Sequence, residues 1–473
     1  MKRTEDRKGE KTMGIDLKDK KCLVFGMGVS GKAAAALLLR EGARVILYDE
    51  KEGADLGVVR SFFEEKDNIS FVCGRLPESI KQGIDLLILS PGVPMENPLV
   101  SGLSGFGVKT IGEIELAYAC GKGRVLAITG TNGKTTTTTL LGDIMKAYSN
   151  REGKGRKVFV VGNIGDPYTA CADRTEEDSV TVAEISSFQL ETIETFKPSV
   201  SAILNITPDH LNRHHTMDNY IAMKRRITEN QDEKDRVILN YDDPITRDMA
   251  KGMRPGVVFF TRKPEEYVPE EGRDLVSLKD GEIFYNDRSI LRTDEVNLLG
   301  SHNYENIMAA VGMAVNAGVP DTVIRDTVRE FKAVEHRIEF VDNKDGADYY
   351  NDSKGTNPDA SIKAVEAMVK PCILIAGGYD KDSSYDELIE ACKGKVKLLV
   401  LLGETAGKIR DCAEAHGFNE ILFADSLEEA VRICHDNARP GDAVLLSPAC
   451  ASWDMFKNYE ERGRLFKELV KSL

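Results

Sequence analysis

Short apolar and β-branched runs alternate with longer stretches of helical periodicity along most of this chain. Such alternation predicts parallel α/β domains, because each parallel strand needs a crossover that a helix supplies. The expected strands are Lys21–Phe25, Arg44–Tyr48, Leu86–Leu89, Arg124–Ile128, Val180–Ala183, Ser201–Leu204, Cys372–Ala376, Leu398–Leu402, Ile421–Ala424 and Ala443–Leu446. The sequence therefore predicts an α/β protein.

Two breaks divide this pattern. A glycine-rich segment, Gly121–Gly123, precedes the strand that opens a middle unit, and a further doubly wound unit starts near Val334. Turn dipeptides at 280–281 and 286–287 predict an antiparallel hairpin inside the middle unit. A length of 473 residues suits about three domains. We expect a disordered tail at 1–15 and domains at 16–120, 121–333 and 334–473.

Charge and composition exclude several classes of protein. The chain has 63 basic and 77 acidic residues and a net charge of −14, which argues against non-specific binding to nucleic acid. It has no run of about 18 apolar residues for a membrane span, and residues 1–14 lack the apolar core of a secretory signal. Nine cysteines without a Cys-x-x-Cys pair argue against a disulfide framework or zinc ribbon and favour reduced thiols in a cytoplasm.

The strongest chemical signal lies at residues 125–139, where a strand runs into a glycine-rich turn and a helix start. Gly130 and Gly133 allow backbone N–H groups to close around phosphate oxygens. Lys134 would reach the outer phosphates, and the Thr135 hydroxyl would bind Mg²⁺. Ile128 stands where the strict motif has its first glycine, so the alternative is an ordinary threonine-rich helix start. The spacing nevertheless favours binding of a nucleoside triphosphate.

A second glycine-rich turn, Gly26–Gly31, lies between an expected strand and helix, with Asp49 at the end of the next strand. This is the spacing of the dinucleotide fingerprint. Three interpretations stay open: an NAD site, which would make the protein an oxidoreductase, a site for another nucleotide, and glycines that serve only close packing.

Two further strand ends carry candidate ligands. Glu184 follows a strand near the phosphate loop, where Mg²⁺ needs a second contact, although a helix start capped by Ser186 or Ser187 explains the same segment. Asp209 and His210 follow another strand and are placed for a metal or a phosphate.

The remaining histidines and lysines of interest carry weaker signals. His214 and His215 are interpreted as solvated loop residues, and Lys224 as a surface lysine on a helix. Lys354 and Lys381 lie in polar loops after strands of the last unit. They suit a small anionic substrate, and solvated loops are the equal alternative.

Together these segments resemble the Mur ligase family of ATP-dependent amide ligases. They cover nearly the whole chain from Lys20 to Leu469 in the family's order, as G-x-G-x-S-G, GTNGKTTT, GNIG, EISSFQLE, TPDHL, HNYEN, EHRIE, NDSKGTN, GGYDK and LSPACASWDMFKNYEERG. The branch that adds D-glutamate fits best. The DNPR segment of the diaminopimelate-adding and lysine-adding relatives is absent, and Asn132 stands where the alanine-adding relative has histidine.

The resemblance implies a fold and a reaction. The fold would have a Rossmann-like UDP-binding domain, a central P-loop ATPase domain and a C-terminal Rossmann-like domain that binds the amino acid. The reaction would join D-glutamate to UDP-N-acetylmuramoyl-L-alanine through an acyl phosphate made with ATP, in cytoplasmic synthesis of peptidoglycan precursors. The resemblance also implies a monomer that binds neither nucleic acid nor membrane.

The resemblance assigns roles to individual residues as well. ATP would be bound by Gly130, Thr131, Asn132, Gly133, Lys134, Thr135, Thr136, Asn303, Asn306, Arg337 and Asp352. The other substrates would contact Ser30, Asp49, Ser90, Ser186, Gln189, Thr356, Lys381, Ser452 and Tyr459, where Tyr459 replaces a common phenylalanine. Two Mg²⁺ ions would be held by Thr135, Glu184, His210 and Lys224, the last as a carbamate. Catalysis would depend on Lys134, Asn163, His210 and Lys224.

Three alternatives remain at this point. The turn at 26–31 alone would fit an NAD-dependent oxidoreductase. A nucleotide-binding regulator that has lost catalysis is disfavoured, because Glu184, His210 and Lys224 are all present. A folylpolyglutamate-type ligase is the nearest relative in mechanism, but its phosphate loop continues with Gly-Ser after the lysine, where this chain has Thr135-Thr136.

Overall fold

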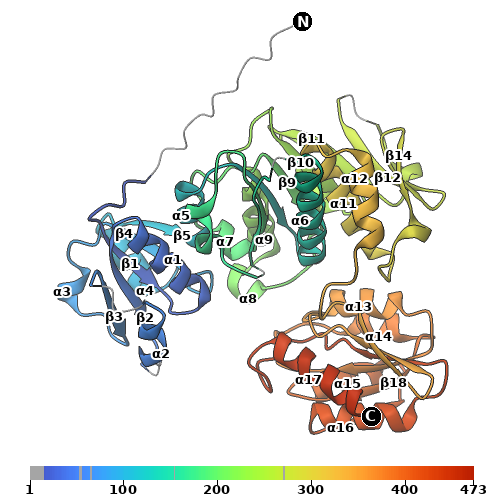
Figure 1. The fold of residues 1–473 in the computed structure, drawn as a ribbon. Helices are drawn as coiled ribbons and strands as arrows, with labels where there is room; N and C mark the ends of the chain where they lie inside the picture. The colour runs from blue at the N-terminus through green and yellow to red at the C-terminus, as the bar shows by residue number, and fades with distance from the viewer. Residues whose placement is uncertain (1–14, 53–55, 64–66, 154, 164, 270–271) are drawn as a thin grey trace, which may run out of the picture.

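The computed structural model describes residues 15–52, 56–63, 67–153, 155–163, 165–269 and 272–473. Within this described chain the strands form three sheets, each from its own stretch of sequence. Figure 1 shows the three parts in blue, in green to yellow, and in orange to red. The α/β class is confirmed. The tail expected at residues 1–15 lies outside the described residues, apart from Ile15.

The N-terminal sheet is parallel and has the order β3-β2-β1-β4-β5. All four residues of β4, Leu-Leu-Ile-Leu, are buried, as expected for a strand covered on both faces. The strands are β1 (Lys21–Phe25), β2 (Arg44–Asp49), β3 (Ile69–Cys73), β4 (Leu86–Leu89) and β5 (Lys109–Gly112), and the helices are α1 (Val29–Arg40), α2 (Leu56–Ser61), α3 (Glu78–Lys81), α4 (Pro98–Gly105) and α5 (Glu113–Cys120).

The central sheet has the order β14-β13-β12-β11-β10-β9-β6-β8-β7 and is parallel from β7 to β12. The two turn dipeptides join β12, β13 and β14 into an antiparallel meander, which is larger than the hairpin predicted. The strands are β6 (Arg124–Thr129), β7 (Val158–Gly162), β8 (Val180–Glu184), β9 (Val200–Ile203), β10 (Arg236–Asn240), β11 (Gly256–Thr261), β12 (Asp274–Lys279), β13 (Glu282–Tyr285) and β14 (Arg288–Arg292).

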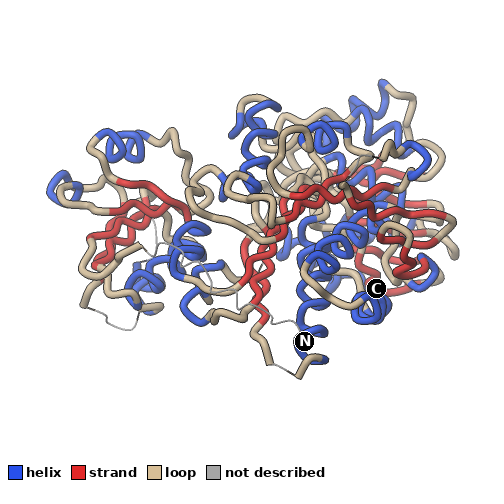
Figure 2. Tube along the Cα trace, turned by 90° about the horizontal axis from the view of Figure 1, so that it is seen from above, coloured by secondary structure: helices blue, strands red, loops and turns tan. Residues whose placement is uncertain are grey.

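Helices cover the central sheet on both sides, so the strands form a band between them in Figure 2. They are α6 (Lys134–Arg151), α7 (Ser187–Leu190), α8 (Leu211–His214), α9 (Met217–Arg225), α10 (Pro244–Met249), α11 (His302–Asn316) and α12 (Asp321–Glu330), with 3-10 turns at Tyr168–Ala170, Ala172–Arg174, Arg226–Thr228, Pro264–Glu266 and Thr293–Glu295. α6 starts with Lys134 and five threonines, a poor helix-forming run. Because Thr135 to Thr138 are buried, packing rather than propensity stabilises this helix start.

The C-terminal sheet has the order β15-β16-β20-β17-β18-β19 and is parallel except for the β15–β16 pair. Its strands are β15 (Glu339–Lys344), β16 (Ala347–Asn351), β17 (Cys372–Ala376), β18 (Val396–Leu401), β19 (Ile421–Phe423) and β20 (Ala443–Leu446). Its helices are α13 (Pro358–Ala367), α14 (Asp386–Cys392), α15 (Ala406–Ala415), α16 (Leu427–Asn437) and α17 (Tyr459–Ser472).

The apolar cores differ in extent. One buried cluster runs without a break from Leu47 of the N-terminal sheet, through Leu116 of α5, to Ala127 and Leu239 of the central sheet. The clusters under the C-terminal sheet contain only residues from Ile338 onward. None of the described helices is long and apolar enough to cross a membrane.

Candidate active site

The phosphate loop connects β6 to α6. Gly130 and Gly133 have φ values of 150° and 84°, and a Cβ on Gly133 would lie 2.1 Å from Asn306 Oδ1. Both glycines are therefore required by the shape of the turn. Lys134 folds back over this turn, and its Nζ donates to the backbone oxygens of Gly130 and Thr131 at 2.9 and 2.8 Å. Burial lowers the pKa of this amine, although Glu184 acts against the shift.

Lys224 of α9 reaches the same loop. Its side chain is buried, its Nζ donates to the oxygen of Gly130 at 2.8 Å, and the ammonium lies 4.5 Å from the centre of the Tyr220 ring. The prediction of a surface lysine is therefore wrong, because the helix face that carries Lys224 packs on the phosphate loop. Burial, reinforced by Lys134, brings the Lys224 pKa well below its usual range.

Glu184 ends β8, next to the loop. Its Oε1 accepts from Asn163 Nδ2 at 2.9 Å, while Oε2 is buried and accepts no hydrogen bond of good geometry among the described residues. Burial acts to raise the pKa of this carboxyl, but Lys354 and Lys134 lower it overall. A buried, ionised oxygen without a partner is suited to a cation such as Mg²⁺.

The helix that starts after Glu184 has a serine cap, as the alternative interpretation of this segment predicted. Ser186 is the N-cap of α7, and its backbone N–H and hydroxyl both contact Gln189. The capping interpretation is therefore confirmed, and it is compatible with Glu184 as a metal ligand, which stays a prediction.

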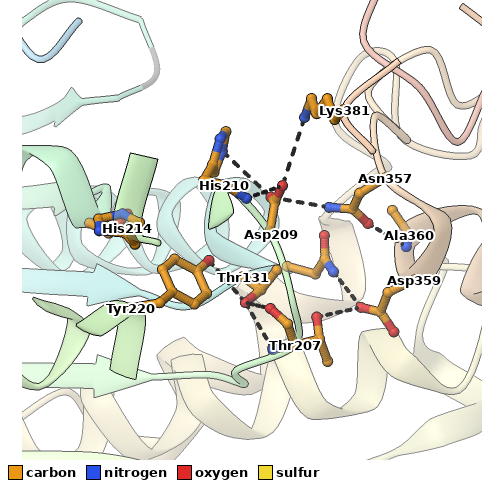
Figure 3. A network of polar contacts seen from close by, with 12 residues as sticks. Thr131, Thr207, Asp209, His210, His214, Tyr220, Asn357, Asp359, Ala360 and Lys381 are labelled. Carbon is orange, nitrogen blue, oxygen red and sulfur yellow. Dashed lines mark hydrogen bonds and ion pairs between the residues drawn. The ribbon is translucent and has the colours of Figure 1, made fainter. Parts of the chain in front are cut away.

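Asp209 and His210 lie after β9, facing the C-terminal part (Figure 3). Asp209 Oδ1 is 3.8 Å from Lys381 Nζ, and its Oδ2 is 3.5 Å from His210 Nε2. Asn357 Nδ2 also donates to this carboxylate at 3.4 Å. Burial lowers the pKa of His210 to about 4, with Asp209 acting against the shift, so the imidazole is neutral at pH 7.

Lys354 links the C-terminal part to the phosphate loop. Its Nζ donates to Thr135 Oγ1 at 2.7 Å, and burial lowers its pKa to about 8. Arg337 lies nearby, with a buried Nε that has no hydrogen-bond partner among the described residues. The structure thus brings both loops with candidate lysines to the central part, since Lys381 also contacts it.

Asp359, on the first turn of α13, makes a second link. Its Oδ2 accepts from Asn132 Nδ2 and from Thr207 Oγ1 at 3.3 Å (Figure 3). It also accepts from Lys363 Nζ at 3.0 Å. Asn132 is itself fixed in the phosphate loop, because its backbone N–H donates to Asn205 Oδ1 at 2.8 Å. A carboxylate of the C-terminal part therefore holds a side chain of the phosphate loop.

A cavity lies beside the loop, between the central and C-terminal parts. The candidate nucleotide residues Asn303 and Asn306 line it from α11. It is also lined by Asn132, Gly133, Thr136, His302, Arg337, Asp352 and Lys363. Burial raises the pKa of the Asp352 carboxyl to about 7, against a hydrogen bond from Ser447 Oγ. The nucleotide candidates from both parts therefore gather at one cavity.

The candidates of the N-terminal part gather at the other edge of the central part. Asp49 Oδ2 accepts from the backbone N–H of Met27 at 3.1 Å, inside the glycine-rich turn. Ser90 packs on that turn, and Ser30 lies in the first turn of α1. A cavity of about 240 Å³ is lined by both Ser90 and Gln189, which connects this edge to the central part.

The remaining substrate candidates, Thr356, Ser452 and Tyr459, lie in the region of Lys354. Its Nζ lies 5.1 Å from the centre of the Tyr459 ring, and the Thr356 backbone N–H donates to the Lys354 oxygen at 2.9 Å. Ser452 is buried in the segment after β20, where the backbone of Ala449 donates to Gly355. Lys381 is directed instead toward Asp209.

Sequence reasoning missed two residues of this region. Asp359 gave no signal, because its partner Asn132 is 227 positions away. His214 is buried rather than solvated: its Nε2 lies 2.9 Å from Ser187 Oγ, and its ring stacks on Phe188. That prediction was wrong, because α8 folds back onto α7.

These features define a three-part α/β protein whose phosphate loop is completed by charged side chains from its C-terminal part. The chain belongs to the Mur ligase family. The N-terminal domain of MurD-like Mur ligases matches residues 20–112, the Mur ligase middle domain matches 128–314, and the glutamate ligase domain of Mur ligases matches 336–450.

Individual relatives agree over the full length. The chain is 53% identical to UDP-N-acetylmuramoylalanine–D-glutamate ligase of Lachnospira eligens, over 97% of this chain and 100% of that protein. It is 51% identical to the enzyme of the same name from Lachnoclostridium phytofermentans, over 96% and 98%. The fold also matches the crystal structure of UDP-N-acetylmuramate-alanine ligase from Thermotoga maritima, with a TM-score of 0.59, 18% identity and coverage of 96% and 99%.

Proposed function

We propose that this protein is an ATP-dependent ligase that joins D-glutamate to UDP-N-acetylmuramoyl-L-alanine, a step of peptidoglycan precursor synthesis. Family membership and relatives of that name at 53% and 51% identity support this. The observation that carries it is the contact of Lys354 with Thr135, which makes the phosphate loop a site shared between two domains. A ligase that couples ATP to an amino acid needs such a shared site.

A carboxylate reacts poorly with amines, because the group that would have to leave it is oxide. The proposed chemistry follows from this. Transfer of the γ-phosphoryl group to the substrate carboxylate would give an acyl phosphate, which has a good leaving group. Lys134, Lys354 and Arg337 would neutralise the charge that develops on the phosphoryl oxygens. The amine of D-glutamate would then attack the acyl carbon, lose a proton and expel phosphate. Because His210 is assigned below to a metal ion, its lone pair is not free for that proton, which passes to solvent.

Magnesium fits the residues present. Glu184 offers its unpartnered buried oxygen and Thr135 offers a hydroxyl, both of the hard type that Mg²⁺ prefers. We assign these two residues, with His210 and a carbamylated Lys224, to two Mg²⁺ ions. The bound ions would supply charge neutralisation at the phosphates. The low pKa of Lys224 supports carbamylation, because only a neutral amine adds to CO₂ and releases a proton.

The other site assignments are part of the same proposal. UDP would lie at the N-terminal edge against Ser30, Asp49 and Ser90, and the substrate would extend past Ser186, Gln189 and Asn163 toward the phosphate loop. ATP would occupy the loop and the cavity lined by Asn303, Asn306, Arg337 and Asp352. D-glutamate would contact Thr356, Lys381, Ser452 and Tyr459. We place the domains at 16–120, 121–333 and 334–473, in a cytoplasmic monomer.

Phosphate release tests the proposal directly. The protein is incubated with ATP, Mg²⁺ and UDP-N-acetylmuramoyl-L-alanine, together with each member of a panel of D- and L-amino acids and meso-diaminopimelate. We expect release only with D-glutamate, and a product whose mass equals the amide of the two substrates. Release with another amino acid would contradict the assigned acceptor, and no release with any acceptor would contradict the ligase activity.

A further inference from the structure

Four potential metal ligands meet between α14 and α15, and none of them belongs to the site described above. Asp386 and Glu390 lie one turn apart on α14. Cys412 lies on α15, and His416 is the residue that ends that helix. Residues four apart share one face of a helix, so each helix directs a pair of ligand atoms into the space between them.

Three of these atoms are close enough to share one ion. Ligand atoms of Asp386, Cys412 and His416 all lie within 4.8 Å of one another. His416 Nε2 is 3.5 Å from Asp386 Oδ1 and 4.0 Å from Glu390 Oε1, whereas Cys412 Sγ lies 3.9 Å from the other ring nitrogen, Nδ1. Bonds of about 2.0 Å to nitrogen and 2.3 Å to sulfur place tetrahedral ligands roughly 3.5 Å apart. Binding at Nε2 would therefore require the Cys412 and Glu390 side chains to rotate toward the ion.

The imidazole is held through the nitrogen that a metal would not use. His416 Nδ1 lies 2.9 Å from the backbone oxygen of Cys412. Because a carbonyl only accepts, Nδ1 carries a hydrogen, and Nε2 is directed toward Asp386 and Glu390, where a metal ion would take the place of any proton on Nε2. A ring fixed through its other nitrogen in this way is the usual arrangement of metal-bound histidine.

A metal would displace contacts among partly exposed side chains. Glu390 accepts from Lys393, an exposed pair on the same helix, and Asp386 accepts from Ser384 Oγ and from the Cys412 thiol. By contrast, the other cluster of this kind, Glu335–His336–Glu339, is occupied, because Lys467 Nζ contacts both carboxylates and Asn351 contacts His336.

We propose that Asp386, Cys412 and His416, with Glu390 as the fourth ligand, bind a divalent transition-metal ion of the zinc class. Thiolate and imidazole select such ions over Mg²⁺, which prefers oxygen ligands. Binding replaces the thiol proton by the metal and releases that proton to solvent. The ion bridges α14 and α15.

The position of the site gives it a structural consequence. Asp386 follows the loop that carries Lys381, and both residues line a cavity that His210 also lines. A metal held by Asp386 fixes the start of α14 behind this loop. We therefore expect a higher melting temperature of the metal-loaded protein, since binding to the folded state alone stabilises it.

Cobalt(II) is the probe that tests this site, because its spectrum identifies thiolate ligands and tetrahedral geometry without any turnover. The full-length protein is titrated with Co²⁺ in excess Mg²⁺, which occupies sites made of oxygen ligands. We expect a thiolate-to-cobalt charge-transfer band that saturates at one equivalent, intense tetrahedral d–d bands, and loss of both when Zn²⁺ is added.

Variants separate this site from the other cysteines. Cys412→Ser, nearly isosteric, should remove the charge-transfer band, and His416→Gln should weaken Co²⁺ binding at least tenfold. Cys120→Ser, a partly buried cysteine of α5, is the matched control and should keep the band. Absence of the band in the parent protein, or its survival in Cys412→Ser, would overturn the proposal. Neither result depends on the ligase activity.

Discussion

The N-terminal and C-terminal domains are joined to the central domain by different kinds of contact. At the N-terminal interface, α5 inserts buried carboxylates into the central domain, and Glu115 accepts from the backbone N–H groups of Glu194, Thr195 and Phe196 at 2.8 to 3.0 Å. The apolar core continues through this interface. At the C-terminal interface the contacts are between side chains, Lys354 with Thr135, Asp359 with Asn132 and Lys381 with Asp209.

The difference indicates which interface opens. Carboxylates that satisfy buried backbone groups cannot separate without leaving those groups unpaired, so the N-terminal interface is permanent. Side-chain hydrogen bonds and an ion pair around a phosphate loop can exchange partners with a nucleotide, because phosphates compete for the same lysines. We infer that the C-terminal domain moves during turnover and the N-terminal domain stays in place.

The largest effect is expected in the phosphate loop, onto which the C-terminal interface closes. Lys134→Ala removes the cation nearest to the transferred phosphoryl group and should lower kcat by about a thousandfold. The fold should remain intact, because among the described residues Lys134 donates hydrogen bonds to its own loop alone. Phosphate release and thermal melting measure the two quantities. A variant with near-parental kcat would contradict the phosphate-loop assignment.

Substitutions at the N-terminal interface should instead lower the stability of the protein. Glu115→Ala leaves three backbone N–H groups, one buried and two partly buried, without this acceptor and should lower the free energy of unfolding by about 3 kcal/mol. Urea denaturation measures it. Glu194→Ala, in the same interface but with an exposed side chain paired to Lys109, is the matched control and should cost less than about 1 kcal/mol. Equal costs for the two variants would show that this interface is no different from a surface contact.

The sequence predicted the strands better than the interfaces. The expected bounds of β1, β4, β17 and β20 agree with the structure, because strands buried on both faces are continuous apolar runs. Lys224, His214 and Asp359 gave no usable signal. Their positions depend on partners brought together by the tertiary fold, as in the contact of Lys224 with Gly130, 94 positions away. Lys224 and Asp359 are charged residues on helices, and a charged residue in a helical pattern normally predicts exposure to solvent.

A smaller effect is expected when the C-terminal interface loses one link. Asp359→Ala removes the acceptor of Asn132, and a hydrogen bond to a charged group contributes about 1.5–3 kcal/mol. We expect the nucleotide-free protein to open, seen as a larger radius of gyration in small-angle X-ray scattering, and KM for ATP to change about tenfold. Glu366→Ala, an exposed carboxylate two turns along α13, is the control. No change in scattering would contradict a closing role for Asp359.

The smallest effect is a pH dependence that separates activity from stability. Burial lowers the Lys354 pKa to about 8 from 10.5, so the folded protein binds fewer protons than the unfolded chain between these values. The contribution of Lys354 to stability therefore rises with pH between these two pKa values, while the positive charge that Lys354 brings to the phosphate loop is lost. We expect kcat/KM to fall about twofold by pH 8 and further above it, since this parameter reports the free enzyme. Lys354→Arg keeps its charge and should not show that fall, whatever its activity at pH 7. A fall with the same midpoint in both proteins would mean that another group titrates, and the link from the C-terminal domain to Thr135 would then not depend on the charge of Lys354.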